Sequence, residues 1–136
     1  MTTPPLSEFC TAVREAFSFL RTFGFEEVAV PAHRSSNPFQ IWFRAGDRLV
    51  VVVGEGYGTM ASVTLEHDGR ELSEIYLVPT DERPGRAGRK HQLGQLEQIH
   101  AAARRLQHYG ADFLAGDVSR FLSIAKPLPP YKKPDD

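Results

Sequence analysis

The chain has 136 residues, of which 16 are lysine or arginine and 17 are aspartate or glutamate, so its formal net charge is −1. Hydrophobic residues make up 41% and charged residues 24%, which is typical of a globular protein and excludes a disordered or collagen-like chain. This length supports one hydrophobic core, so we expect a single domain over 1–136, with extended or disordered tails at 1–5 and 127–136.

An amphipathic helix is predicted over 6–23. Its apolar residues recur every three or four positions and occupy one side of the helix, whereas polar residues occupy the other. Gly24 stands where a left-handed C-terminal stop is expected. About half of the helix surface should therefore pack against an apolar layer. The apolar residues are Leu6, Phe9, Cys10, Val13, Ala16, Phe17, Phe19, Leu20 and Phe23.

Between residues 25 and 79 the hydrophobic period changes from 3.6 to 2, which predicts antiparallel β-strands. Two residue pairs, Gly46-Asp47 and Asp68-Gly69, are typical of two-residue hairpin turns. Pro31 and Pro38 bracket a polar loop that closes the first strand. The predicted strands cover 25–30, 38–45, 48–54, 59–67 and 70–78.

The last third of the chain predicts a mobile loop over 80–92 and then two helices, over 91–109 and 112–126. Gly110 ends the first helix, Asp112 or Asp117 can cap the second, and Pro127 ends it. The predicted fold is α+β. It is a two-layer sandwich in which an N-terminal helix, a five-stranded antiparallel meander and two C-terminal helices follow one another, with all helices on one sheet face.

The hairpin turns determine which side chains share a face of the sheet. Around Asp68-Gly69, Leu65 pairs with Leu72 and Glu66 pairs with Glu71. We assign to the helix layer Ala61, Val63, Leu65, Leu72 and Tyr76. The first hairpin has two apolar faces, made of Phe39, Ile41, Phe43, Val50 and Val52, and of Trp42, Leu49, Val51 and Val53.

Only one of these two faces can meet the helices, and the other is larger than an apolar patch that a monomer usually exposes. Three covers are possible: the C-terminal residues 128–131, a second copy of the chain, or a different protein. A shift of the strand register by one residue would exchange the two faces.

No group of residues points to a specific catalytic chemistry. The glycine-rich segment 54–58 precedes a strand rather than a helix, so a phosphate-binding loop is not expected. His100 and His108 lie about 12 Å apart along a helix, too far to share one metal ion. The pair Glu66 and Glu71 remains, and Arg44 or a cationic partner could offset its repulsion. We expect no cofactor and no metal, and leave enzymatic activity open.

The compartment also follows from the sequence. The longest apolar run, Leu49 to Val53, is far shorter than the ~20 residues of a membrane helix. The first ten residues lack the pattern of a signal peptide, and Cys10 is the only cysteine, so no intramolecular disulfide can form. We therefore expect a cytoplasmic protein without a membrane segment.

Charge is distributed unevenly along the chain. Residues 55–82 contain seven acidic residues and one arginine, whereas 83–105 contain six basic residues and one glutamate. The loop residues Arg83, Arg86, Arg89 and Lys90 could contact an acidic protein surface or a small anion, while the balanced total charge disfavours nucleic acid. With Trp42, these four are the candidate interaction residues.

The leading helix that ends in Phe23-Gly24-Phe25, the strand meander and the closing segment 109–117 (YGADFLAGD) give the chain a characteristic layout. This layout resembles small uncharacterised bacterial α+β proteins, some of which are organised like immunity proteins of toxin systems. The resemblance implies a binding protein and assigns no functional residue.

The expected function is therefore a non-enzymatic protein-interaction domain, of the immunity-like kind that the resemblance implies, whose partner is another protein or a second copy of the chain in a homodimer. The alternative is a small-molecule-binding protein or a small enzyme with a pocket between sheet and helices. That pocket would draw its polar groups from Tyr57, Tyr76, Glu74 and His67.

Overall fold

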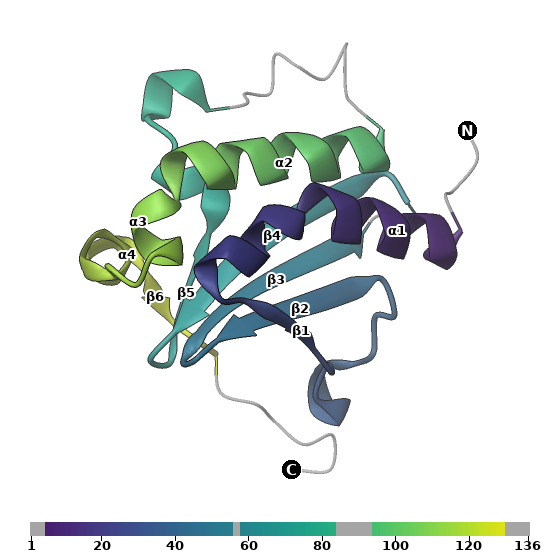
Figure 1. Ribbon diagram of the computed structural model, residues 1–136, viewed down its shortest axis with the longest axis horizontal. Coiled ribbons are helices and arrows are strands. Elements are labelled where there is room, and N and C mark those ends of the chain that lie inside the picture. Colours follow the sequence, from purple (N-terminus) through teal and green to yellow (C-terminus); the bar gives the residue numbers. More distant parts are fainter. Residues whose placement is uncertain (1–4, 56–57, 84–93, 130–136) are drawn as a thin grey trace.

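The computed structural model describes residues 5–55, 58–83 and 94–129. It has two layers, a six-stranded antiparallel sheet and a layer of helices that lies on one face of the sheet (Figure 1). The strands follow one another across the sheet in chain order. They are β1 (Glu26–Val28), β2 (Gln40–Ala45), β3 (Arg48–Glu55), β4 (Met60–His67), β5 (Arg70–Ser73) and β6 (Lys126–Pro127).

The helix layer consists of α1 (Leu6–Ala16) and α2 (Gln95–Tyr109), which lie side by side over the sheet, with α3 (Ala111–Leu114) and α4 (Ser119–Ile124) at one end (Figure 1). Short 3₁₀ helices connect the larger elements in the described part of the chain. They are η1 (Ser18–Phe23), η2 (Ala32–Arg34), η3 (Glu74–Leu77) and η4 (Thr80–Glu82). The predicted α+β class and the placement of the helices are confirmed.

The leading helical segment ends as the sequence predicts. The α-helix stops at Ala16 and continues as η1, and Gly24 follows in the left-handed region with a φ of 85°. The backbone N–H of Phe25 donates to the carbonyl oxygen of Leu20 at 3.1 Å, which closes the turn into β1. A side chain at position 24 would be strained at this φ, so glycine suits the turn.

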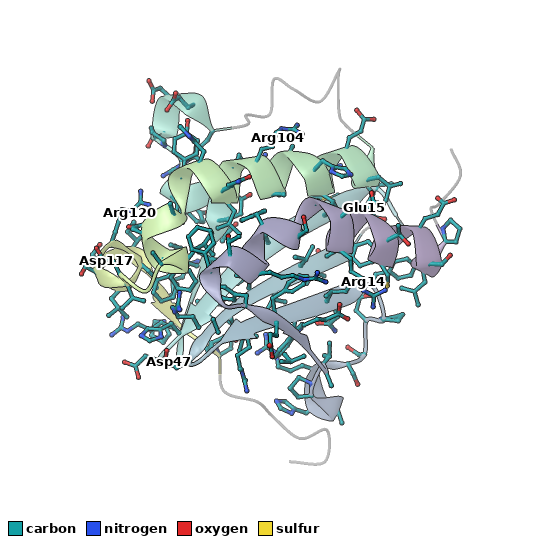
Figure 2. The ribbon with its side chains drawn as sticks, in the orientation of Figure 1. Arg14, Glu15, Asp47, Arg104, Asp117 and Arg120 are labelled. Carbon is teal, nitrogen blue, oxygen red and sulfur yellow. The ribbon has the colours of Figure 1, made fainter. Side chains whose placement is uncertain are left out.

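Both hairpin registers are confirmed. Phe43 pairs with Val50 across the first turn, where Asp47 is labelled in Figure 2, and Leu65 pairs with Leu72 across the second. Of the two apolar faces of the first hairpin, the one that meets the helices contains Ile41, Phe43, Val50 and Val52. The central core also includes Phe9, Phe17, Leu20, Phe25, Val63, Leu65, Leu72, Ile99, Leu106, Phe113 and Phe121.

The predicted fifth strand is too long. It was predicted over 70–78 but ends at Ser73, where the chain turns into η3, so residues 74–78 do not pair with β4. Glu74 is instead buried against Arg105 of α2, and Tyr76 is 45% exposed rather than part of the helix-facing layer. The early turn is explained by this ion pair, which joins residues 31 positions apart and has no local signature in the sequence.

Side chains of α2 take the place of the missing strand pairs. The Ala61 N–H donates to Gln98 Oε1 at 3.0 Å, and Gln98 Nε2 donates to the Thr59 carbonyl at 2.7 Å. Gln95 Nε2 donates to the Met60 carbonyl at 2.9 Å. A Cβ atom at Gly54 would lie 2.6 Å from Gln95 Nε2, so only glycine leaves room for this amide.

A sixth strand was not expected. Lys126 and Pro127 pair with Glu71 and Arg70 of β5, and the Leu128 N–H donates to the Gly69 carbonyl at 2.9 Å. The single helix predicted over 112–126 is divided into α3 and α4 because Gly116 adopts a φ of 104°.

Candidate functional site

The second face of the sheet is covered by the chain itself. Trp42, Leu49 and Val51 form a small cluster there and are only 3%, 9% and 3% exposed. Half-buried Val28, Val30 and Val53 pack around them. The extensive uncovered apolar patch that the sequence suggests is therefore reduced to isolated exposed residues among those that the structure describes.

Arg34 of η2 forms the polar part of this cover. Its guanidinium carbon lies 4.4 Å from the centroid of the Trp42 ring on β2, and its nitrogen atoms donate to both carboxylate oxygens of Glu66 on β4, at 3.0 and 2.7 Å. Since β3 lies between these strands, the arginine side chain spans β3. The Glu66 side chain is 6% exposed, so this ion pair is nearly removed from water.

The same arginine compensates the negative charge of the paired carboxylates on β4 and β5. Glu66 and Glu71 are cross-strand neighbours as predicted, but Arg34 rather than Arg44 compensates them. The hydrogen bond and charge of Glu66 raise the pKa of Arg34, and the charge of Glu71 adds to the effect. The sequence contained one local signal, a basic residue in the loop between Pro31 and Pro38, but not its destination 32 positions away.

Of the other candidate interaction residues, the structure describes Arg83 alone, and Arg86, Arg89 and Lys90 lie outside the described residues. Arg83 Nε donates to the Val78 carbonyl at 2.8 Å and Nη2 donates to the Tyr76 carbonyl at 3.4 Å. Its guanidinium carbon lies 5.2 Å from the centroid of the Tyr76 ring. Arg83 and Tyr76 thus form an ordered cation–π pair at the surface beside η3, which is separate from Trp42.

Behind this surface, the ion pair of Arg105 and Glu74 attaches η3 to α2. Arg105 Nη2 and Nε donate to Glu74 Oε1 at 2.6 and 3.1 Å. Burial raises the pKa of Glu74, although the hydrogen bonds of Arg105 act in the opposite direction. The pair attaches the 3₁₀ turn that carries the exposed Tyr76 to α2.

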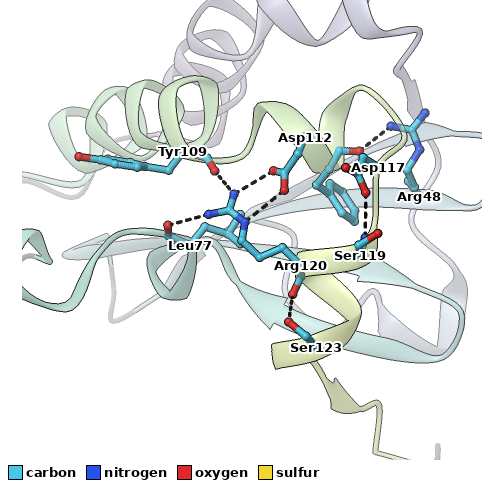
Figure 3. Close-up of polar contacts among 9 residues, drawn as sticks. Arg48, Leu77, Tyr109, Asp112, Asp117, Ser119, Arg120 and Ser123 are labelled. Atoms are coloured by element: carbon cyan, nitrogen blue, oxygen red, sulfur yellow. Dashed lines mark hydrogen bonds and ion pairs between the residues drawn. The ribbon is translucent and has the colours of Figure 1, made fainter.

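A second arginine network holds the C-terminal helices in place. Arg120 donates to both carboxylate oxygens of Asp112, to the carbonyl of Leu77 and to the carbonyl of Tyr109 (Figure 3). Burial has the largest single effect and raises the pKa of Asp112, but the hydrogen bonds and charge of Arg120, together with backbone hydrogen bonds at Phe113 and Asp112, bring the pKa below its usual value. All groups of this network have partners within the protein, which is typical of a structural role.

A cavity of about 440 Å³ lies between the end of α1, η1 and the strand β1. It is lined by Arg14, Phe17, Ser18, Leu20 and Arg21, by the consecutive residues Gly24 to Glu27, and by Phe43 of β2. None of Tyr76, Glu74 and His67, which the alternative function would place around a pocket, lines this cavity, and Tyr57 lies outside the described residues.

The residues that the structure describes contain no cluster of histidine, cysteine, aspartate and glutamate side chains suited to a metal ion. No helix in the same part of the chain is both long and apolar enough to cross a bilayer. Comparison of the chain with protein-family models, with curated proteins and with solved structures finds no match.

Proposed function

We propose that the chain is a non-enzymatic protein-interaction domain whose contact surface is centred on Tyr76 and Arg83. The observation that carries this proposal is the ordered pair itself. Tyr76 is 45% exposed, and Arg83 is held against its ring by two backbone carbonyls.

Tyrosine and arginine are the residue types that contribute most to binding energy at protein interfaces. An exposed side chain usually loses conformational freedom when a partner binds, and this loss weakens the complex. Here much of that freedom is already lost, because Arg83 is bonded to the backbone and Tyr76 stands on a segment attached to α2 by Glu74. The pair is therefore well suited to contact a second protein.

The charges that follow in the sequence indicate what this partner presents. Arg86, Arg89 and Lys90 follow Arg83 within the next seven positions, so the partner surface is acidic. The resemblance of the sequence layout to immunity-like proteins supports the same class of function.

The test is affinity capture from the native cell with the full chain, followed by titration calorimetry with the purified partner. Tyr76→Ala and Arg83→Ala should each weaken binding at least about tenfold. Leu6→Ala is the matched control, because Leu6 lies on α1 and is 40% exposed, close to the exposure of Tyr76. Unchanged affinity of both variants, or the absence of any specific partner, would contradict the proposal.

A further inference from the structure

The cavity beside η1 is lined by polar side chains from the first helical segment, which α1 and η1 form together. These side chains belong to Arg14, Ser18 and Arg21. Arg14 and Ser18 are four positions apart in this segment, and Ser18 and Arg21 are three apart in a 3₁₀ helix, which has three residues per turn. The three residues therefore lie on one side of the segment.

The strand β1 contributes a carboxylate to the same cavity. Glu27 pairs with Phe43 of β2 and, like Phe43, lies on the helix-facing side of the sheet. Arg14 donates to both carboxylate oxygens of Glu27, at 2.9 and 3.0 Å, and its hydrogen bond lowers the pKa of Glu27. A carboxylate has about four acceptor positions, and Glu27 is 41% exposed, so acceptor positions remain for a ligand.

Two donors of the helical segment have no partner in the part of the chain that the structure describes. Neither the Ser18 hydroxyl nor the Arg21 guanidinium makes a hydrogen bond or ion pair with another described residue, and both residues are exposed. Guanidinium and hydroxyl groups are common donors to carboxylates. Ser18 and Arg21 can therefore receive an anionic group.

The charges that line the cavity balance. Arg14 and Arg21 are matched in number by Glu26 and Glu27. A ligand with a net negative or a net positive charge gains no advantage from this lining. A molecule that carries one charge of each sign fits it better, because Arg21 and Glu27 can each contact the opposite charge.

The size and the apolar lining of the cavity limit the ligand further. A volume of about 440 Å³ lies within the range of roughly 300–1,000 Å³ that is typical of small-molecule sites. The apolar side chains of the lining are only 1–7% exposed, so they offer little surface to a large apolar group. They are Phe17, Leu20, Phe25 and Phe43. The ligand is therefore small and mainly polar.

We propose that this cavity binds a small zwitterion, either a free amino acid or a short peptide with both termini free. The ligand carboxylate accepts hydrogen bonds from Arg21 and Ser18, and the ligand ammonium group donates to Glu27. Arg14 is a positioning residue, because it orients the Glu27 carboxylate. The site is distinct from the Tyr76–Arg83 pair and does not depend on it.

The test titrates the ¹⁵N-labelled full chain with L-alanine and with L-alanyl-L-alanine, each to roughly ten millimolar, and follows the amide chemical shifts. Shifts should concentrate at residues 18–27. The probe that binds more tightly distinguishes an amino-acid ligand from a peptide ligand. Acetylation of its amine or amidation of its carboxylate should each weaken binding at least fivefold, because each change removes one of the two charges.

Two variants connect each end of the probe with its contact in the cavity. In Arg21→Gln, amidation should no longer weaken binding, whereas acetylation still should. Glu27→Gln should show the reverse pattern. Arg104→Gln is the matched control, because Arg104 is exposed on the outer side of α2 (Figure 2), and it should retain both effects.

Three results would overturn the proposal: no shifts at residues 18–27 with either probe, equal binding of the blocked and unblocked probes, or an undiminished effect of amidation in Arg21→Gln. Sodium acetate that binds as tightly as the zwitterions and shifts the same residues would also overturn it. The cavity would then be an anion site that does not recognise the ammonium group.

Discussion

Ion pairs of arginine with glutamate recur in this protein, and their burial decides what each contributes. Glu66 is 6% exposed and Glu74 is 3% exposed, whereas Glu27 is 41% exposed. All three carboxylates receive at least two hydrogen bonds from an arginine. The three ion pairs therefore have similar hydrogen bonds but differ in burial, so their contributions to stability can be compared.

Replacing Arg34 by methionine should lower the free energy of unfolding by about 2 kcal/mol. The change leaves the buried Glu66 carboxylate without its cation, which typically costs about 3–5 kcal/mol for a fully buried pair. Arg34 is 35% exposed, so water reaches part of the site and reduces the loss. Urea denaturation at neutral pH measures the difference.

The matched control for this substitution is Arg14→Met, which removes an equally well-oriented arginine from Glu27. Both partners of that pair are exposed, and we expect a loss below about 1 kcal/mol. Equal losses in the two variants would show that burial does not separate these pairs.

The pH dependence of stability should have opposite signs at Glu74 and Glu27. Burial raises the folded-state pKa of Glu74 above its unfolded value, so its contribution is greatest at low pH and is lost as pH rises through the folded pKa. The free energy of unfolding of the wild type should therefore increase relative to Glu74→Gln between about pH 7 and about pH 4. Urea denaturation at both pH values measures the change.

Glu27 supplies the control for this experiment. The hydrogen bond of Arg14 lowers the pKa of Glu27, so its contribution is present at neutral pH and is lost as pH falls through the folded value. Relative to Glu27→Gln, the wild type should lose stability on acidification. Changes of the same sign in both comparisons would refute the assignment.

At the scale of elements, the hairpins were predictable and the ends of the sheet were not. Gly46-Asp47 and Asp68-Gly69 are local signals, and a two-residue turn determines the register of its strands. The end of β5 depends on Arg105, far along the chain, and β6 depends on the pairing of Pro127 with Arg70. Contacts of this range leave no periodic pattern in the sequence.

Gln98 should contribute to stability through its hydrogen bonds with Ala61 of β4 and with Thr59, the residue before β4. Gln98→Leu removes the acceptor of the Ala61 N–H and a donor to the Thr59 carbonyl, and should cost about 1 kcal/mol. Gln107→Leu, at an exposed position of the same helix, should change stability by less than about 0.5 kcal/mol. Thermal unfolding of both variants provides the measurement, and equal melting temperatures would contradict this role for Gln98.

At the scale of the whole molecule, the sequence predicted two layers, the helix-covered face and the apolar second face. It did not predict the cover of that second face, which forms where Arg34 of η2 contacts Trp42 and the more distant Glu66. It also did not predict the cavity beside β1, which Phe43 of the neighbouring strand helps to line. The charge on the protein surface also differs from the charge counted along the sequence. Two of the seven acidic residues in 55–82, Glu66 and Glu74, are buried and neutralised, so the surface of the meander is less acidic than the count indicates.

Trp42 is the only tryptophan of the chain, and it belongs to the small cluster under Arg34 rather than to the central core. Its intrinsic fluorescence therefore originates from the second sheet face alone. Far-ultraviolet circular dichroism, in contrast, is dominated by the helices of the other layer. The protein thus carries separate optical signals for its two faces, and uncovering of the second face can be followed without any label.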